Sequence, residues 1–270
     1  MTATVPSFAE SIAAARGERG IALMPFIAAG YPDLATSLAI LPALAGAGAA
    51  AIEVGFPFSD PVADGPVIQA AFTEALLKGL KVDQIFDGVA AIKDRIAVPM
   101  AAMVSYSIVY RYGVERFAKR AKEAGFSGLI VPDLPPPEAQ NVCGLIQAAG
   151  LATILLISPS TPPGRRAEIA RLCSGFIYYL SISGITGERD QLPAGVEDNV
   201  RQIKSLTGVP VCVGFGVSKP QHVRQLTGVA DGAIVGSAVV RRIQQHAGEP
   251  TDAVVAAVVA YVQELGKDAR

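Results

Sequence analysis

The sequence contains few of the residues that metal sites, disulfides and nucleic-acid surfaces need. Its 270 residues include two histidines and three cysteines, which are widely spaced. Neither a zinc site nor a disulfide framework is expected, and no metal is predicted. Charged residues make up 17% and the net charge is −1, so no surface for nucleic acid or an anionic membrane is predicted. This composition is typical of a soluble protein of a reducing compartment, the cytoplasm or, in a plant, the plastid stroma.

Targeting and membrane segments are also missing. The N-terminus has no basic region, and Glu10 interrupts its apolar residues, so no signal peptide is predicted. Two uncharged stretches, residues 34–52 and 139–164, are long enough for a membrane helix, but Pro42 and Pro159 interrupt them. A helix followed by a buried strand explains each stretch better.

Short apolar runs recur along the chain, in which 51% of the residues are hydrophobic. The runs are continuous blocks of Val, Ile, Leu and Ala, which is typical of parallel strands covered on both faces. There are eight of them: Ile21–Ala29, Ala50–Gly55, Val98–Val104, Gly128–Val131, Ala152–Ile157, Gly175–Ser181, Val209–Gly214 and Gly232–Gly236.

Helical patterns fill the segments between these runs, as in Val114–Gly125, where an apolar stripe opposes charged residues. Eight strand–helix repeats without a linker predict an α/β fold: a closed (β/α)₈ TIM barrel formed by residues 1–270 as a single domain. An open doubly wound sheet is the alternative. Extra helices are predicted before the first strand, at Phe8–Ala15, and after the loop of the second strand, where Pro66–Gly79 and Val82–Asp94 both look helical.

A lone carboxylate, Glu53, ends the second apolar run. In such barrels the chemistry lies at the C-terminal ends of the strands and in the loops that follow. Burying an ionised carboxylate is costly unless it is paired or its pKa shifts, so Glu53 is a candidate catalytic residue. The alternative is a structural glutamate that pairs with a core arginine or caps a loop.

The next loop, FPFSDPVADGP at residues 56–66, contains two aspartates within a turn-forming sequence. Asp60 and Asp64 could each reach back over the barrel mouth toward Glu53. The alternative is that both are turn residues, with Asp64 capping the helix that starts at Pro66.

Glycines follow the seventh and eighth strands, where phosphate-binding barrels hold their phosphate. Gly214 and Gly216 flank a phenylalanine, and Gly236 with Ser237 opens a helix. Backbone amides at glycines and at a helix N-terminus can bind an anion. This arrangement predicts a phosphate site, and ordinary tight turns are the alternative.

The loop after the sixth strand, residues 181–195, is longer than the ~2–6 residues usual for such a connection, which predicts a lid. Gly184 and Gly187 could be its hinges, and Thr186 could hydrogen-bond a ligand. A flexible surface loop is the alternative. Tyr178, in the strand before it, faces either the barrel interior or the outer helices.

Several segments together resemble the tryptophan synthase alpha chain family. They occur in the family's order and spacing over residues ~20–240. The most specific is AIEVGFPFSDPVADGPVIQAA; the others are PFIAAGYPD, GLIVPDLP, YYLSISGITG and GFGVSKPQHV with DGAIVGSAVV.

The resemblance implies a (β/α)₈ barrel and a lyase reaction in tryptophan biosynthesis. Family members cleave indole-3-glycerol phosphate to indole and glyceraldehyde 3-phosphate, without a metal or organic cofactor. They work in a heterotetramer of two alpha and two beta chains. Indole passes through a tunnel to the beta chain, which depends on pyridoxal phosphate.

The resemblance also implies roles for individual residues. The two catalytic carboxylates correspond to Glu53 and Asp64. The remaining positions are Phe26 and Thr186 for the indole pocket and lid, Gly187, Gly216, Gly236 and Ser237 for the phosphate, and Asp60 for contact with the beta chain. We also assign Tyr178 to the substrate pocket, with core packing as its alternative.

The sequence departs from the family at two places. Ser105 and Ser107 stand where many members have tyrosine and asparagine, and Ile182 stands where some have arginine. These departures leave the carboxylates and the glycine loops intact. They predict a changed indole pocket and changed coupling to a beta chain before a changed activity.

The implied chemistry assigns different states to the two carboxylates. Desolvation should raise the pKa of Glu53, so that it acts as an acid and then as a base. Asp64, expected to be more solvated, should stay ionised and accept the indole N–H. The alternatives are another phosphate-handling barrel, a free-standing indole-3-glycerol-phosphate lyase, and a non-catalytic subunit that only activates a beta chain.

Overall fold

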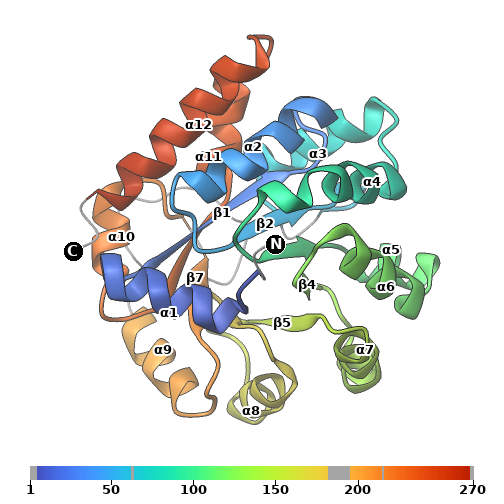
Figure 1. Cartoon of the computed structure of the whole chain (residues 1–270). Coiled ribbons are helices and arrows are strands. Elements are labelled where there is room, and N and C mark those ends of the chain that lie inside the picture. The colour runs from blue at the N-terminus through green and yellow to red at the C-terminus, as the bar shows by residue number, and fades with distance from the viewer. Residues whose placement is uncertain (1–4, 62–63, 182–194, 215, 268–270) are drawn as a thin grey trace.

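Eight parallel strands form a closed barrel in the computed structural model, which describes residues 5–61, 64–181, 195–214 and 216–267 (Figure 1). Each strand pairs with the next, and the last pairs with the first. The strands are β1 (Ala22–Ala28), β2 (Ile52–Gly55), β3 (Met100–Met103), β4 (Gly128–Ile130), β5 (Ala152–Ile157), β6 (Ile177–Leu180), β7 (Val211–Gly214) and β8 (Gly232–Val235). The predicted TIM barrel is confirmed.

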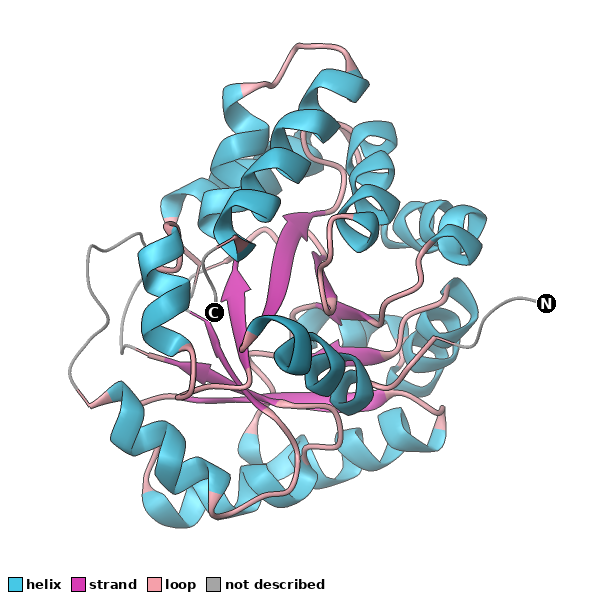
Figure 2. Ribbon diagram, turned by 60° about the vertical axis from the view of Figure 1, so that its left-hand side comes forward, coloured by secondary structure: helices cyan, strands magenta, loops and turns pink. Residues whose placement is uncertain are grey.

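Helices surround the barrel on all sides (Figure 2). They are α1 (Phe8–Arg19), α2 (Leu34–Gly46), α3 (Pro66–Leu77), α4 (Val82–Ile92) with a short 3₁₀ turn (Lys93–Arg95), α5 (Tyr106–Tyr112), α6 (Val114–Ala124), α7 (Pro136–Ala148), α8 (Pro163–Leu172), α9 (Val196–Lys204), α10 (Pro220–Leu226), α11 (Ser237–Gln245) and α12 (Thr251–Gly266). The predicted extra helices correspond to α1 and to the pair α3 and α4, whereas α5 and α12 were not predicted. None of the helices described is long and apolar enough to cross a membrane.

The N-terminal end of the barrel is closed by α1, which lies across the strands in Figure 1. Its Phe8 and Ile12 join an apolar cluster with Met24 of β1 and with Phe176, which directly precedes β6. The rings of Phe8 and Phe176 meet edge to face, with centroids 5.5 Å apart. This end is therefore packed, which leaves the opposite end of the barrel for a site.

Asp231, just before β8, fixes this closed end. Its Oδ1 lies 2.7 Å from Nη1 of Arg16 and 3.1 Å from Nζ of Lys204, and its Oδ2 accepts a 2.8 Å hydrogen bond from the backbone N–H of Val211. One buried carboxylate thus joins α1, α9 and β7. Because both of its oxygens are paired, its burial is compensated.

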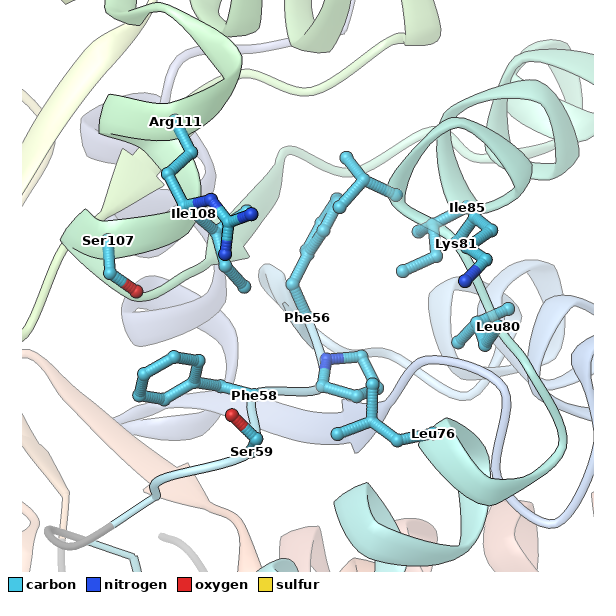
Figure 3. A pocket seen from close by; sticks show the side chains of 12 residues that line it. Phe56, Phe58, Ser59, Leu76, Leu80, Lys81, Ile85, Ser107, Ile108 and Arg111 are labelled. Atoms are coloured by element: carbon cyan, nitrogen blue, oxygen red, sulfur yellow. The ribbon is translucent and has the colours of Figure 1, made fainter.

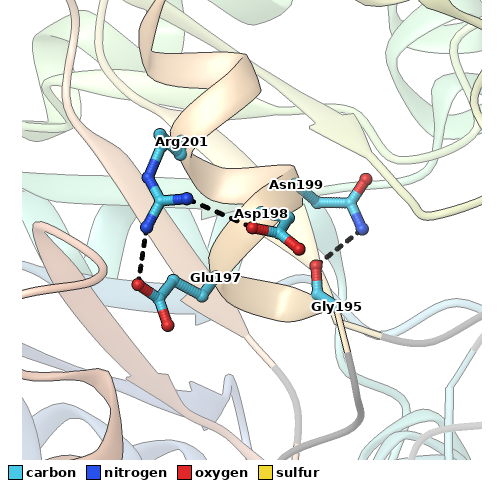
Figure 4. Close-up of polar contacts among 5 residues, drawn as sticks. All are labelled: Gly195, Glu197, Asp198, Asn199 and Arg201. Carbon is cyan, nitrogen blue, oxygen red and sulfur yellow. Dashed lines mark hydrogen bonds and ion pairs between the residues drawn. The ribbon is translucent and has the colours of Figure 1, made fainter.

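Helix α9 begins directly after the segment 182–194, and exposed polar contacts define its first turn (Figure 4). Arg201 pairs with Glu197 at 2.7 Å and with Asp198 at 3.2 Å, and Asn199 donates to the Gly195 carbonyl at 2.8 Å. Acidic side chains in the first turn also interact favourably with the positive end of the helix dipole. Each exposed pair is worth only about 0.3–0.5 kcal/mol, so these contacts locate the helix start without dominating its stability.

Candidate active site

Glu53 lies at the open end of the barrel, where β2 runs between Phe26 of β1 and Ala101 of β3. Its side chain is buried, with the residue 1% exposed, and neither carboxyl oxygen has a hydrogen-bond partner among the described residues. The alternative of a structural glutamate paired with a core arginine is therefore wrong for this part of the chain. Burial raises the pKa of Glu53 to about 8, so the carboxyl carries a proton at neutral pH.

The raised pKa predicts that Glu53 makes stability depend on pH. Below pH 4.5, its ordinary pKa, the carboxyl is protonated in both the folded and the unfolded chain. Above that value the unfolded chain releases the proton first, so the stability falls as the pH rises toward 8. Linkage gives a loss of about 3 kcal/mol between pH 4.5 and 7.

Glu53→Gln removes this titration. The free energy of unfolding of the variant, minus that of the wild type, should therefore increase by about 3 kcal/mol from pH 4.5 to pH 7. Urea denaturation of both proteins at the two pH values measures this difference. Parallel stability curves for the two proteins would show that Glu53 does not ionise with a raised pKa.

Asp64 lies in the loop between β2 and α3. The residue before the first turn of α3 is Gly65, and no side chain of the described residues caps that helix, so the helix-cap alternative for Asp64 is wrong. Contacts to the loop's backbone hold it instead: the N–H of Asp64 donates to the Pro61 carbonyl at 3.0 Å, and Nε2 of the Gln69 side chain donates to the Asp64 carbonyl at 2.7 Å. Neither contact uses the Asp64 carboxylate, so this carboxylate is available to bind a ligand.

Asp64 is half-buried, and it is therefore more solvated than the fully buried Glu53, as the sequence predicts. Burial raises the pKa of Asp64 to about 6, because the loop packs against the barrel mouth. Since about 6 still lies below the value for Glu53, the two carboxyls remain in different states near pH 7: Glu53 protonated and Asp64 mostly ionised.

Tyr178 faces the barrel interior, which decides between the two orientations left open by the sequence. It packs beside the interior cluster, with its ring centroid 6.5 Å from that of Phe176. Its pKa is raised well above the ordinary value, first by burial and then by the negative charges of Glu53 and Asp64. The three predicted residues therefore share one electrostatic environment at the barrel mouth.

Gly214, at the end of β7, leaves free the space that the Tyr178 ring occupies. A Cβ atom at Gly214 would overlap Cε1 and the hydroxyl oxygen of Tyr178. Gly214→Ala should therefore displace this ring and lower kcat/KM for the proposed substrate by about 10- to 100-fold, the usual effect of a small misplacement in a site. Gly144→Ala is the matched control, because a Cβ there meets no described atom within 4 Å. Equal activity of both variants would contradict a role for the position of Tyr178.

Phe26 forms an apolar wall of the same opening. Its ring lies over Gly55, where a Cβ atom would overlap it, and it contacts the Phe72 ring edge to face at a centroid distance of 6.4 Å. Phe72 comes from α3 and was not among the predicted residues. Together the two rings give the opening an aromatic side on which a flat apolar ligand can pack.

The predicted phosphate residues lie in the loops after β7 and β8. Gly216 has a φ of 65°, which favours glycine, and Gly236 precedes α11, whose first residue is Ser237. In the part of the chain that the structure describes, no side chain caps this helix, so its first-turn amides have no partner within the helix and can receive an anion. Thr186 and Gly187, predicted for the lid and the phosphate, lie outside the described residues, as does Ile182.

A small cavity adjoins Asp64 on the side of β3 and β4. It has a volume of about 80 Å³, and its wall includes three carboxylates, those of Asp60, Asp64 and Asp133, together with Ser105 and Met103. Asp133 was not predicted, although a carboxylate just after the fourth strand is the kind of signal that identified Glu53. Among the described residues, no group of histidine, cysteine and acidic side chains is arranged to hold a metal.

A wider groove of about 420 Å³ lies on the other side of the β2–α3 loop (Figure 3). Phe56 and Phe58 line both this groove and the smaller cavity. Figure 3 shows Lys81 and Arg111 on opposite sides of Phe56. The groove is therefore mostly apolar and has a positively charged rim next to the loop that carries Asp60 and Asp64.

Comparisons with known proteins agree with this arrangement. The family model of the tryptophan synthase alpha chain matches residues 12–270. The alpha chain of Rhodopirellula baltica is 45% identical over 84% of this chain and 83% of its own length, and that of Chloroflexus aurantiacus is 40% identical over 95% and 96%.

Solved structures give the same result. Mycobacterium tuberculosis tryptophan synthase superposes with a TM-score of 0.88 at 34% identity, over 99% of both chains. A mutant tryptophan synthase alpha-subunit from Pyrococcus furiosus superposes with a TM-score of 0.83 at 36% identity, over 92% of this chain and 98% of that one. The chain belongs to the tryptophan synthase alpha chain family.

Proposed function

We propose that this chain is a lyase that cleaves indole-3-glycerol phosphate to indole and glyceraldehyde 3-phosphate by a retro-aldol reaction. One observation carries the proposal. The buried carboxyl of Glu53, which has no hydrogen-bond partner among the described residues and a pKa of about 8, shares the barrel mouth with Asp64, whose pKa is about 6. Two carboxyls in different protonation states at one pH can take two roles in one reaction.

Glu53 supplies and recovers the proton in this mechanism. Its carboxyl donates a proton to carbon 3 of the indole ring, which leaves positive charge spread to the ring nitrogen. The resulting carboxylate then takes the proton of the side-chain hydroxyl next to the ring. As that O–H bond breaks, a carbonyl forms, the bond to carbon 3 breaks, and its electron pair returns to the ring. Glu53 ends protonated, as it began.

Asp64 and the glycine loops hold the substrate during this step. The ionised Asp64 accepts the indole N–H and stabilises the positive charge that develops on nitrogen. Backbone amides at Gly216, Gly236 and Ser237 bind the phosphate, with Gly187 as a further contact. Phe26, Tyr178 and Thr186 complete the pocket and its lid, and binding of the phosphate orients the reacting carbon.

A beta chain is the proposed partner, in an assembly of two alpha and two beta chains to which indole is passed. Tryptophan synthase alpha chains work with such a chain, and the exposed Asp60 is the proposed contact residue. The groove beside it supports this, because Leu77 and Tyr110, next to groove residues in sequence, are 83% and 68% exposed. We further propose that residues 1–270 act as one domain in the cytoplasm, or in the plastid stroma in a plant.

The experiment that tests this function is indole release. The purified chain, incubated with indole-3-glycerol phosphate, should form indole and glyceraldehyde 3-phosphate in equal amounts, and adding the beta chain of the same organism should raise the rate. Full activity without the beta chain would instead identify a free-standing lyase. Stimulation of the beta chain without any indole release would identify a non-catalytic subunit.

A further inference from the structure

The reaction proposed above assigns no substrate group to the small cavity beside Asp64, although Asp64 and Phe72 of the proposed site also line it. It lies between the β2–α3 loop and the ends of β3 and β4, where Met103, Ser105 and Asp133 lie, and it is partly open to solvent, since Asp60 and Asp133 are exposed. Its volume of about 80 Å³ is several times the ~10–15 Å³ of cavity volume that one water molecule needs. The cavity can therefore hold a group of one or two heavy atoms attached to a ring in the main pocket.

The position of Asp64 decides which edge of the substrate faces this cavity. If Asp64 accepts the indole N–H, the benzene carbons on the nitrogen side of the ring, carbons 6 and 7, come next to the cavity that Asp64 lines. The phosphate end of the substrate is excluded from it, because Asp60 and Asp133 also line the cavity and like charges repel. The glycine loops after β7 and β8 receive the phosphate elsewhere.

The polar lining of the cavity has unused acceptor capacity. Asp133 accepts a 2.7 Å hydrogen bond from Oγ of Ser105 at Oδ2 and a 2.7 Å bond from the Tyr106 N–H at Oδ1. A carboxylate offers about four acceptor positions, so roughly two remain. Among the described residues no lysine or arginine pairs with Asp133. The lining therefore favours a neutral group that donates a hydrogen bond.

We propose that this enzyme accepts substrates with a small hydrogen-bond donor, such as a hydroxyl, on carbon 6 of the indole ring. In this arrangement Asp133 accepts the hydrogen bond, and the small side chain of Ser105 leaves the room for the group. The proposal deepens the function above, because it names a substrate class for the same site. It makes Asp133 and Ser105 specificity-determining residues.

The test compares 6-hydroxyindole with 6-methylindole, since the two substituents have similar size and differ in hydrogen bonding. Binding of each compound to the wild-type chain is measured by titration calorimetry. Their kcat/KM values are measured in the reverse condensation with glyceraldehyde 3-phosphate, with indole as reference. We expect the hydroxyl compound to be preferred by about tenfold or more in both measurements, as for a hydrogen bond to a charged acceptor.

Variants at Asp133 and Ser105 test whether these two residues cause the preference for the hydroxyl compound. Asp133→Asn keeps a carbonyl oxygen for the Tyr106 N–H but loses the charge, so the preference should fall to within about threefold. Ser105→Leu should fill the cavity and weaken both substituted compounds at least tenfold relative to indole, whereas Ser105→Ala, which leaves it open, should not. Asp94→Asn, in the exposed 3₁₀ turn, is the control and should keep the wild-type preference.

The outcomes separate the two proposals. A wild-type chain that condenses indole but binds and converts both 6-substituted compounds equally would overturn the inference and leave the proposed function intact. An unchanged preference in Asp133→Asn would overturn it as well. A chain with no turnover of indole would overturn the proposed function, and the binding ratio would then still decide the inference.

Discussion

Glu53→Gln is expected to lower kcat for indole release by about 10⁴-fold. Glutamine has nearly the same size as glutamic acid, but it can neither donate the proton that carbon 3 needs nor take the proton of the side-chain hydroxyl. Each loss of general acid–base catalysis typically costs about 10²–10⁴-fold, and here one side chain has both roles. Steady-state release of indole measures the effect.

The fold and the phosphate site should survive this change. Because glutamine removes a buried ionisable group, the variant should be at least as stable at pH 7, and it should bind a phosphate-bearing substrate analogue within a few-fold of the wild type. Glu264→Gln, on the exposed surface of α12, is the matched control and should keep full activity. Residual turnover of Glu53→Gln comparable to that of the control would remove Glu53 from the chemistry.

Asp64→Ala is expected to lower kcat by roughly 10²–10⁴-fold, the usual effect of removing a group that stabilises developing charge. Alanine leaves the ring nitrogen without an acceptor at the moment when it becomes positive. Asp64→Asn should lose nearly as much, since its amide lacks the negative charge. Both variants should fold normally, because the backbone of Asp64 and the side chain of Gln69 hold the loop without using the Asp64 carboxylate.

The opposite pattern would assign Asp64 a structural role. A variant with a lower thermal midpoint but undiminished turnover would mean that the side chain serves only the loop. Circular dichroism melting and indole release, measured on the same preparations, distinguish the two results.

The sequence predicts the barrel because every strand carries its own signal. A strand covered on both faces must be apolar along its length, as residues 50–55 are, and a single carboxylate there is conspicuous. Helix α5 gave no comparable signal, since the run from Tyr106 to Tyr112 has no clear helical stripe. Its start depends on Ser105 and on Asp133, a residue 27 positions beyond Tyr106, and local patterns do not reveal such a contact.

The sequence predicted which residues form the candidate site better than it predicted the solvation and the contacts of their side chains. Glu53 and Asp64 follow from position and resemblance, but the solvation of Asp64 depends on how its loop packs, which no local pattern gives. The contact between Gly214 and Tyr178 joins two neighbouring strands that are far apart in the chain. Asp133 was missed for a different reason: it lies after a short strand, within a sequence that resembles an ordinary proline turn.

Direct titration of Glu53 tests the central claim of this account most closely. The carboxyl carbon of Glu53 can be followed by nuclear magnetic resonance in protein labelled with ¹³C-glutamate, with Glu53→Gln used to assign its signal. A titration midpoint near pH 8 is predicted for the ligand-free chain, because the buried carboxyl holds its proton. A midpoint near 4.5, the ordinary value for glutamate, would mean an ionised side chain that has no proton to give to the ring.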